Sequence, residues 1–312
     1  MPLSELNFSD LYLGEVNRWV SGVPQTLDPI PAPEDCLADL NELRELCVES
    51  HAADGKEEFS IAHKGVTYRA SLLQSLSENV FVLRRFPKEI PLLETLNIHP
   101  HYVSLLLGQR LSGLIVVAGA YGQGKTTTAS SIVAGRIAKH GGVAVCIEDP
   151  PEMPLEGRHG EGVVYQRWVD KGGFAHECRQ AARWAPSIIF VGEVRDSETA
   201  TEALRASING RLVVCTIHSD NVRTAVDRLF SLANGVAGTS DDVASLLATG
   251  LLAIVHQRLE GEPRRPKIEF LWLGGEDALG IRNTIRQRKF MQLDNEITLQ
   301  RNNLLMQSRG RS

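Results

Sequence analysis

The segment GAYGQGKT at residues 119–126 has the spacing G-x-x-x-x-G-K-[ST], which is typical of a loop that cradles phosphate groups. Glycines let such a loop turn its backbone N–H groups toward phosphate oxygens, and the helix that follows adds its positive N-terminal end. Lys125 is expected to reach the β- and γ-phosphates of ATP, and the Thr126 hydroxyl to bind Mg²⁺. The residues predicted to bind the nucleotide are Gly119, Gly122, Gln123, Gly124, Lys125, Thr126 and Thr127.

Three further polar side chains follow apolar segments that have the pattern of β-strands. Glu148 follows VAVCI, Glu193 follows SIIFVG, and His218 follows VVCTI. Ligands of a parallel sheet gather at the carboxyl ends of its strands, so these groups are expected beside the phosphate loop. A strand-end histidine can also simply cap a loop, and the residues alone leave that alternative open for His218.

The position before Glu193 lacks the acid that phosphate-loop ATPases usually carry there. Such enzymes end this strand with Asp and then Glu, but here the first of the two positions is Gly192. Phosphoryl transfer needs a metal ion, a positioned water molecule and cations around the γ-phosphate. We therefore predict that Glu148 and Glu193, from two different strands, divide the metal and water roles.

The elements that must position these groups alternate along the chain. Between about residues 110 and 240, apolar segments such as GLIVVAG alternate with amphipathic ones such as KTTTASSIVAGRIAKH. This alternation favours an α/β fold with a parallel sheet. A capping box from Thr199 to Glu202 is expected to begin one helix, and a cap near Asp220 another. Past residue 240 the pattern is mainly helical.

The first 90 or so residues contain no nucleotide motif. CLADLNELRELCVES predicts a helix that begins near Asp35, and the segment from Glu57 to Pro87 alternates like two or three antiparallel strands. These elements indicate a small α+β domain. FPKEIPLLETLNIHP, with three prolines, has the composition of a linker.

The composition excludes several classes of protein. The chain has 312 residues, 43% hydrophobic and 23% charged, which suggests a soluble protein of about two domains. The net charge of −5 argues against direct binding to nucleic acid. Cys146 and Cys215 lie in apolar segments and are expected to be buried free thiols, as in a reducing cytosol. We see neither a signal peptide nor the ~20 apolar residues of a membrane span, so a cytoplasmic protein is predicted.

Four motifs stand in the order found in the type II/type IV secretion and pilus ATPase superfamily. That order is a P-loop, an Asp box IEDPxE, an atypical Walker B motif VGExRDxET and a His box TxH. They occur here as GAYGQGKTTT, CIEDPPEMP, FVGEVRDSETA and VVCTIHSDN, within about residues 119–229. The chain resembles a PilT-type member of this superfamily. GIRNTIRQ at 280–287 resembles the AIRNLIRE motif of retraction ATPases, and SDLYL near the N-terminus resembles the family's SDLHL.

The resemblance implies roles for the predicted site residues. Glu148 would polarise the attacking water, Glu193 would hold Mg²⁺ through water together with Thr126, and His218 would sense the γ-phosphate. Arginines of the N-terminal domain reach phosphate in this family.

By position the phosphate-reaching arginines would be Arg69 and Arg84. Arg85 remains an alternative to Arg84, and each could instead be a solvated surface cation. Arg195 and Asp196 are expected to order their loop by a mutual or intersubunit pair.

The resemblance also implies an architecture and an assembly. We expect a PAS-like α+β domain at residues 1–96 and a RecA-like ATPase domain at 97–312, whose C-terminal segment is helical from about residue 240. The protein would form a homo-hexamer that uses ATP and Mg²⁺. It would lie in the cytoplasm, peripherally at the inner membrane, and act on a platform protein to power type IV pilus retraction or conjugation-like type IV secretion.

Departures from the family pattern weaken the choice of retraction. The loop is usually GPTGSGKS, and the Asp box usually has an aliphatic residue where Pro151 stands. PilT-like sequences also occur in conjugation and Dot/Icm-like secretion ATPases. The other departures are Ala120, Tyr121 and Gln123 in the loop and Gly280, Thr284 and Gln287 in the retraction motif.

Two other classes of function share part of this pattern. A RecA-like nucleic-acid translocase such as a hexameric helicase would have the same P-loop, but it predicts basic, aromatic-bearing loops along a channel. The acidic balance and the Asp box argue against it. A domain that binds nucleotide only as a structural switch is the remaining alternative, which measurable turnover would eliminate.

Overall fold

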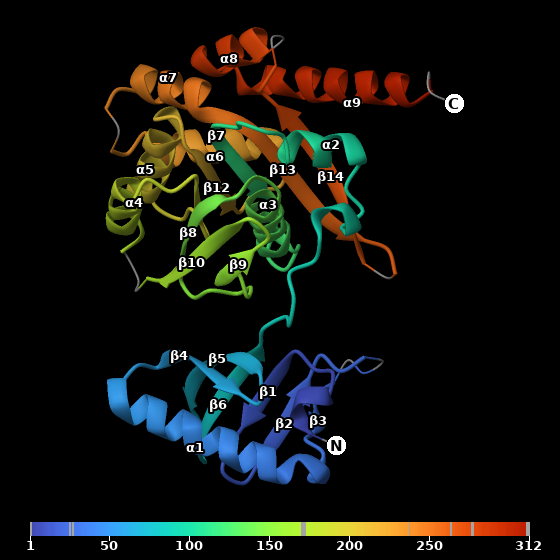
Figure 1. The fold of residues 1–312 in the computed structure, drawn as a ribbon, viewed down its shortest axis with the longest axis vertical. Coiled ribbons are helices and arrows are strands. Elements are labelled where there is room, and N and C mark those ends of the chain that lie inside the picture. The colour runs from blue at the N-terminus through green and yellow to red at the C-terminus, as the bar shows by residue number, and fades with distance from the viewer. Residues whose placement is uncertain are drawn as a thin grey trace. The chain divides into compact units, whose positions relative to one another are not determined.

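The structure, a computed structural model, describes residues 2–24, 26, 28–169, 173–236, 238–262, 264–275 and 278–309. The chain divides into two compact units, Met1–Glu89 and Ile90–Ser312 (Figure 1). Each unit has its own sheet. The predicted fold class, a parallel-sheet P-loop core with a small α+β domain before it and helices at its C-terminal end, is confirmed.

The first unit is an antiparallel sheet with one long helix. Its strand order is β3-β2-β1-β6-β5-β4. The described elements are β1 Asp10–Leu13, β2 Arg18–Ser21, β3 Ile30–Pro31, α1 Leu37–Asp54, β4 Glu58–His63, β5 Val66–Gln74 and β6 Asn79–Arg85, with 3-10 turns at Leu3–Glu5 and Glu34–Cys36.

Alternation along these strands decides which face is covered. Tyr68 and Ala70 of β5 and Leu83 of β6 are buried, together with Leu40 and Leu43 of α1. The residues between them on the strands point to the other face. Helix α1 begins one residue later than predicted. Glu34–Cys36 form a 3-10 turn, and Cys36, not Asp35, occupies the N-cap position.

The second unit is a mixed sheet in the order β14-β13-β7-β12-β11-β8-β10-β9, of which the strands from β13 to β10 are parallel. The described strands are β7 Gly113–Ala118, β8 Gly142–Glu148, β9 Gly157–His159, β10 Gly162–Trp168, β11 Ile188–Val191, β12 Leu212–Ile217, β13 Leu251–Glu260 and β14 Arg265–Trp272. The described helices are α2 Pro100–Leu106, α3 Lys125–His140, α4 Phe174–Arg183, α5 Ser197–Ile208, α6 Val222–Ala233, α7 Ser240–Gly250, α8 Ala278–Arg286 and α9 Leu293–Arg309, with 3-10 turns at Leu93–Thr95 and Phe290–Gln292.

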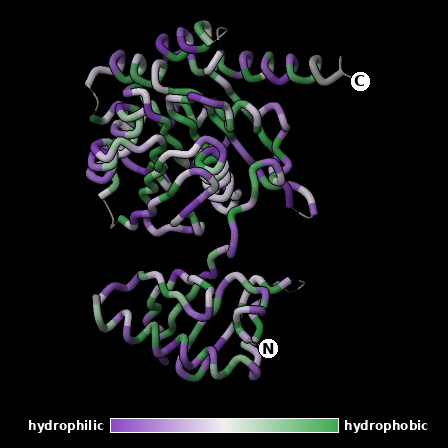
Figure 2. Tube along the Cα trace, viewed as in Figure 1, coloured by the Kyte–Doolittle hydropathy of each residue, from purple (hydrophilic) through white to green (hydrophobic). Residues whose placement is uncertain are grey.

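Helices cover both faces of this sheet. Buried side chains of β7, β8 and β11 pack with α3 on one face, and their neighbours along each strand pack with α4 to α7 on the other. Strands buried on both faces are continuous apolar runs, which is why β7, β11 and β12 were evident from the sequence. Figure 2 shows the hydrophobic colour concentrated on these central strands.

The prediction of a mainly helical chain past residue 240 is wrong for residues 251–272. There LLAIVHQRLE forms β13, which pairs in parallel with β7, and RPKIEFLW forms the antiparallel edge strand β14. A short apolar run has no periodicity that separates a buried strand from a buried helix, so only the pairing decided it. The polar stretch after Glu148 likewise contains β9 and β10, which extend the sheet beyond β8.

One of the two predicted helix caps differs. Asp196, not Thr199, is the N-cap of α5, and its carboxylate accepts from the Thr199 backbone N–H at 2.8 Å. The cap predicted near Asp220 is confirmed, because the adjacent Asn221 caps α6 in a capping box with Thr224.

The cap of α5 predicts a stability change. Asp196→Ala should lower the free energy of unfolding by about 1 kcal/mol, because two donors of Thr199 lose their acceptor. The change in the free energy of unfolding is measured by urea denaturation of the protein, followed through a signal from the second unit. Asp196→Asn should retain most of the stability, since Asn is an equally good cap. An alanine variant as stable as the wild type would contradict the assignment.

Candidate active site

The phosphate loop joins β7 to α3 at the carboxyl edge of the parallel sheet. Gly122 and Gly124 have φ of 68° and 75°, in the left-handed region that favours glycine. Lys125 begins α3 and is 8% exposed, and its Nζ donates to the Ala120 carbonyl of the same loop at 2.9 Å. Burial lowers the pKa of the Lys125 ammonium. A cation held inside a loop of glycines at a helix N-terminus is the arrangement that binds phosphate.

The end of β13 holds this loop from one side. Gln257 Nε2 donates to the Gln123 carbonyl, and the Leu259 N–H donates to Gln123 Oε1 at 2.7 Å. A Cβ at Gly119 would lie 2.5 Å from the Gln257 carbonyl oxygen, so only glycine fits there. The Gln123 side chain is thus occupied by β13, and its backbone is what remains for a phosphate.

Glu148 is the last residue of β8 and is 1% exposed. Its Oε1 accepts from Gln166 Nε2 of the neighbouring strand β10 at 2.8 Å. Burial raises the pKa of the Glu148 carboxyl to about 7, the charge of Glu152 adds to this, and the hydrogen bond from Gln166 opposes it. A carboxyl that titrates near neutral pH is matched to accepting a proton from water.

Gly192 provides the space into which the Glu148 side chain extends. β11 lies beside β8 with Val191 opposite Ile147, so Gly192 comes next to Glu148 at the sheet edge. A Cβ at Gly192 would lie 3.2 Å from Glu148 Cγ, tighter than most real contacts. An aspartate at position 192 would therefore compete with Glu148 for the same space. The acid that the usual motif carries on this strand is replaced by one from the next strand.

Glu193 lies one residue further and joins two partners. Its Oε1 is 3.1 Å from His218 Nε2, and its Oε2 is 2.6 Å from Arg195 Nη2. Burial and then the positive charge of Lys125 lower the pKa of His218, while the charge of Glu193 opposes them. Protonation of His218 is therefore less favourable than that of an ordinary histidine, and its Nε2 faces the Glu193 carboxylate. The expected mutual pair between Arg195 and Asp196 is wrong, because Arg195 pairs with Glu193 and Asp196 caps α5, while the intersubunit alternative stays a prediction.

His218 also faces the phosphate loop. The Tyr121 ring is nearly parallel to the His218 ring, with an interplanar angle of 7° and 6.4 Å between centroids. Lys125 is near enough that the charge of Glu193 acts on its pKa as well. The structure thus brings Lys125, Glu193 and His218 together at one edge of the sheet.

The residues present fit Mg²⁺ only in company with a phosphate. Thr126 lies at the start of α3. Glu193 is the acid whose charge acts most strongly on the pKa of Lys125. Within the described ranges no group of three or more His, Cys, Asp or Glu could hold a metal. Mg²⁺ commonly uses one or two protein ligands, water and substrate phosphates, which this arrangement allows.

Arg69 and Arg84 lie opposite each other on β5 and β6 of the first unit. Both belong to the face that α1 leaves uncovered, and each is paired with an acid, Glu58 at 3.1 Å and Asp10 at 2.7 Å. Like charges directly opposite each other on a sheet are unfavourable. The two acids offset that repulsion. Because Glu58 lies on β4 and Asp10 on β1, the two guanidinium groups extend toward opposite neighbouring strands on this face.

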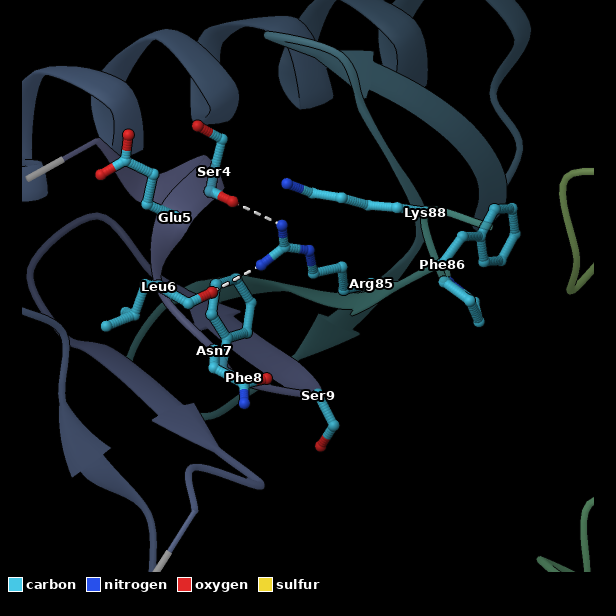
Figure 3. Close-up of a pocket in the computed structure, with 10 residues that line it drawn as sticks. Ser4, Glu5, Leu6, Asn7, Phe8, Ser9, Arg85, Phe86 and Lys88 are labelled. Atoms are coloured by element: carbon cyan, nitrogen blue, oxygen red, sulfur yellow. Dashed lines mark hydrogen bonds between the residues drawn. The ribbon is translucent and has the colours of Figure 1, made fainter. Parts of the chain in front are cut away.

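Arg85 points the other way, because neighbouring residues of a strand alternate. Its Nη1 and Nη2 donate to the carbonyls of Leu6 and Ser4, both at 2.5 Å, and it lies over the Phe8 ring (Figure 3). These contacts line a cavity of about 480 Å³ that also includes Lys88. Arg85 is thus engaged in holding the N-terminal segment, which separates it from Arg84.

Sequence reasoning missed Gln166 and Gln257. Both are partly or fully buried amides whose partners are distant in sequence, on β8 for Gln166 and in the phosphate loop for Gln257, and no motif marks them. A polar side chain within an otherwise alternating strand was the available signal for Gln166. All five cysteines, by contrast, are free and buried, as the apolar context of Cys146 and Cys215 indicated.

The contact at Gly192 predicts a loss of nucleotide turnover. Gly192→Ala should lower hydrolysis of a nucleoside triphosphate on the order of tenfold, because the new methyl displaces the Glu148 side chain. Nucleotide affinity should change little, and both are measured by steady-state kinetics and equilibrium binding. Gly280→Ala is the matched control, since nothing lies within 4 Å of a Cβ there. Equal turnover in the two variants would contradict the role of Gly192.

Comparison with known proteins identifies the family. Residues 48–265 match the family model described as "Type II/IV secretion system protein". The type IV pilus ATPase PilU of Pseudomonas aeruginosa is 32% identical over 82% of this chain and 67% of its own length. The uncharacterized protein YggR of Escherichia coli is 35% identical over 69% of this chain and 64% of its own.

Solved structures agree with this match. The crystal structure of the pilus retraction motor PilT with bound ADP has a TM-score of 0.77, with 29% identity over 95% of this chain and 87% of that one. The ATPase DotB of Legionella pneumophila is 23% identical over 93% of this chain and 85% of its own, and with a TM-score of 0.72 it shares the fold.

The phosphate loop, the acids at the strand ends and these similarities confirm the resemblance described above. The chain belongs to the type II/IV secretion system protein family and is a PilT-like, nucleotide-using ATPase of the pilus and secretion motor class.

Proposed function

We propose that the protein is a hexameric, Mg²⁺-dependent ATP-hydrolysing motor that powers type IV pilus retraction or a related type IV secretion process. The observation that carries the proposal is the convergence of a buried lysine, a buried glutamate and a Glu–His pair at the edge that bears the phosphate loop. Phosphoryl transfer needs these groups and little else from the protein.

The roles follow from the chemistry of each group. Backbone N–H groups at Gly122, Gly124 and Lys125 would hold the phosphates, and the Lys125 ammonium would exchange its Ala120 contact for the β- and γ-phosphates. Gly119, Gln123 and Thr127 would shape the same loop. Mg²⁺, when bound, would supply charge neutralisation between the phosphates, held by Thr126 and, through water, by Glu193.

Glu148 would accept the proton of the attacking water. Its burial at the carboxyl edge of the sheet and its pKa of about 7 suit that task at neutral pH. The Nε2 of His218, which faces Glu193, would turn its proton to the γ-phosphate when that group is present. Loss of the γ-phosphate would then be felt by Glu193 and, through it, by Arg195.

Arg69 and Arg84 would supply further cations to the nucleotide. The planar guanidinium group matches the oxygens of a phosphate. Their acidic partners Glu58 and Asp10 are the groups that a phosphate would displace. The N-terminal unit would thus respond to the nucleotide, and its movement in a ring would be the working stroke.

The relatives include a type IV pilus ATPase as well as type II secretion proteins, so pilus retraction and secretion both remain as the work proposed. In the described part of the chain no helix is both long and apolar enough to cross a membrane, and we propose that the motor works in the cytoplasm on an inner-membrane platform protein. Deletion in the source organism would separate the alternatives. Excess filaments without twitching would support retraction, whereas normal filaments with blocked export or DNA transfer would support secretion.

The role of Glu148 predicts a specific kinetic defect. Glu148→Gln should lower turnover by about 10²- to 10⁴-fold, since the amide cannot accept a proton, while ATP still binds. Lys125→Ala should weaken ATP binding itself. Wild-type turnover should rise with pH through about 7, because Glu148 acts as a base only when it is ionised. Near wild-type turnover of Glu148→Gln would refute its role.

The arginine pair predicts a catalytic effect from the first unit. Arg84→Ala should lower turnover at least tenfold, on the scale that ~1.4 kcal/mol of lost transition-state interaction gives, without a comparable change in stability. Arg44→Ala, on α1, is the control because its partner is Glu15 at 3.5 Å and it lies on the helix side. Equal turnover in the two variants, measured in the assembled protein, would argue against an arginine contribution.

Strong stimulation of ATP hydrolysis by single-stranded DNA would instead favour the alternative function, a nucleic-acid translocase.

A further inference from the structure

We propose that Gln166 is a positioning residue that orients the Glu148 carboxylate toward the attacking water, an inference that rests on the role of Glu148 proposed above. No motif of the sequence includes Gln166. It lies on β10, which pairs in parallel with β8 so that Cys146 is opposite Gln166 and Glu148 is opposite Trp168. Gln166 and Glu148 therefore share the face of the sheet that α3 covers.

The amide of Gln166 has a single possible orientation. Its Nε2 donates to Glu148 Oε1 at 2.8 Å and to the Met153 carbonyl at 2.9 Å, and its Oε1 accepts from the Glu156 N–H at 2.7 Å. Rotation of the amide by 180° would turn its oxygen toward a carbonyl and a carboxylate. The donor that faces Glu148 is thus fixed by the two backbone contacts on either side of it.

This orientation has a consequence for Glu148. A fixed donor on Oε1 defines the plane of the carboxylate, which would otherwise rotate about its last bond. The backbone N–H of Glu152 also donates to the carboxylate. Gln166 and the Asp-box loop together therefore hold the base, while Gly192 leaves it room on the side of β11.

The electrostatic surroundings of Glu148 make Gln166 influential. Burial is the largest influence on its pKa and raises it, and the charged neighbour that acts on it, Glu152, raises it further. On its own strand, Cys146 is a buried thiol whose pKa is itself raised well above the usual range. Arg195, beyond β11, is paired with Glu193. The hydrogen bond from Gln166 is thus the main side-chain interaction that favours the ionised form.

The test is the pH dependence of turnover in the full-length, assembled protein. In Gln166→Leu the acidic limb of the pH profile of kcat should move about one pH unit higher. The reason is that the ionised Glu148 carboxylate loses the hydrogen bond from residue 166. At pH 6 this gives about tenfold lower turnover than the wild type, with KM for ATP nearly unchanged.

A second variant makes the sign of the shift decisive. Gln166→Lys places a cation beside Glu148, so the acidic limb should move to lower pH than in the wild type. A change in stability alone does not move the limb in opposite directions in the two variants. A lysine lowers the pKa of Glu148 by its charge alone, so if the leucine variant fails to fold, Gln166→Met, which also lacks the donor, takes its place.

The matched control is Glu156→Ala. Glu156 accepts from the Gln166 backbone N–H, so its loss loosens the same hairpin without touching Glu148. The limb in this variant should stay at the wild-type pH even if stability falls. Limbs that do not move in the folded Gln166 variants overturn the positioning role. If Glu148→Gln also retains turnover, the proposed function of Glu148 fails as well, so the two failures are distinguishable.

Discussion

The burial of one carboxylate governs the rest of this site. Glu148 ends a central strand with almost no exposure to water, where an unpaired charge is costly. It can remain there because Gln166 and the backbone of the following loop donate hydrogen bonds to it. Gly192 also has no side chain that would fill the space that Glu148 occupies. The absence of an acid at position 192 is thus the condition for having one at position 148.

A second constraint links the phosphate loop to the edge of the sheet. The loop contacts β13 through Gln123, Gln257 and Leu259, and β13 is one strand of a hairpin that continues into β14. α9 packs against β14, where Gln300 exchanges hydrogen bonds with the backbone of Trp272. The C-terminal helix α9 is therefore connected, through direct contacts of β14 and β13, to the loop that would bind the phosphates.

The Glu193 carboxylate links three groups that belong to three different motifs of the sequence. It contacts His218 after β12 and Arg195 in its own loop, and its charge acts on Lys125 in the phosphate loop. Because each of these interactions is a direct contact or a short-range electrostatic effect, a change of charge at the phosphates would act on Glu193. Through Glu193 it would act on Arg195 in the loop before α5. Asp196, which caps α5, is adjacent to that route.

Elements with local signals could be predicted from the amino-acid order. The phosphate loop, the central strands β7, β8, β11 and β12 and the acids at their ends were evident, because fully buried strands and glycine-rich turns have local patterns. Features that depend on pairing between distant segments became visible in the folded structure. β13 could not be separated from a helix, Arg84 could not be separated from Arg85, and Gln166 carried no motif. Their environments are set by neighbouring strands, and a linear pattern does not contain that information.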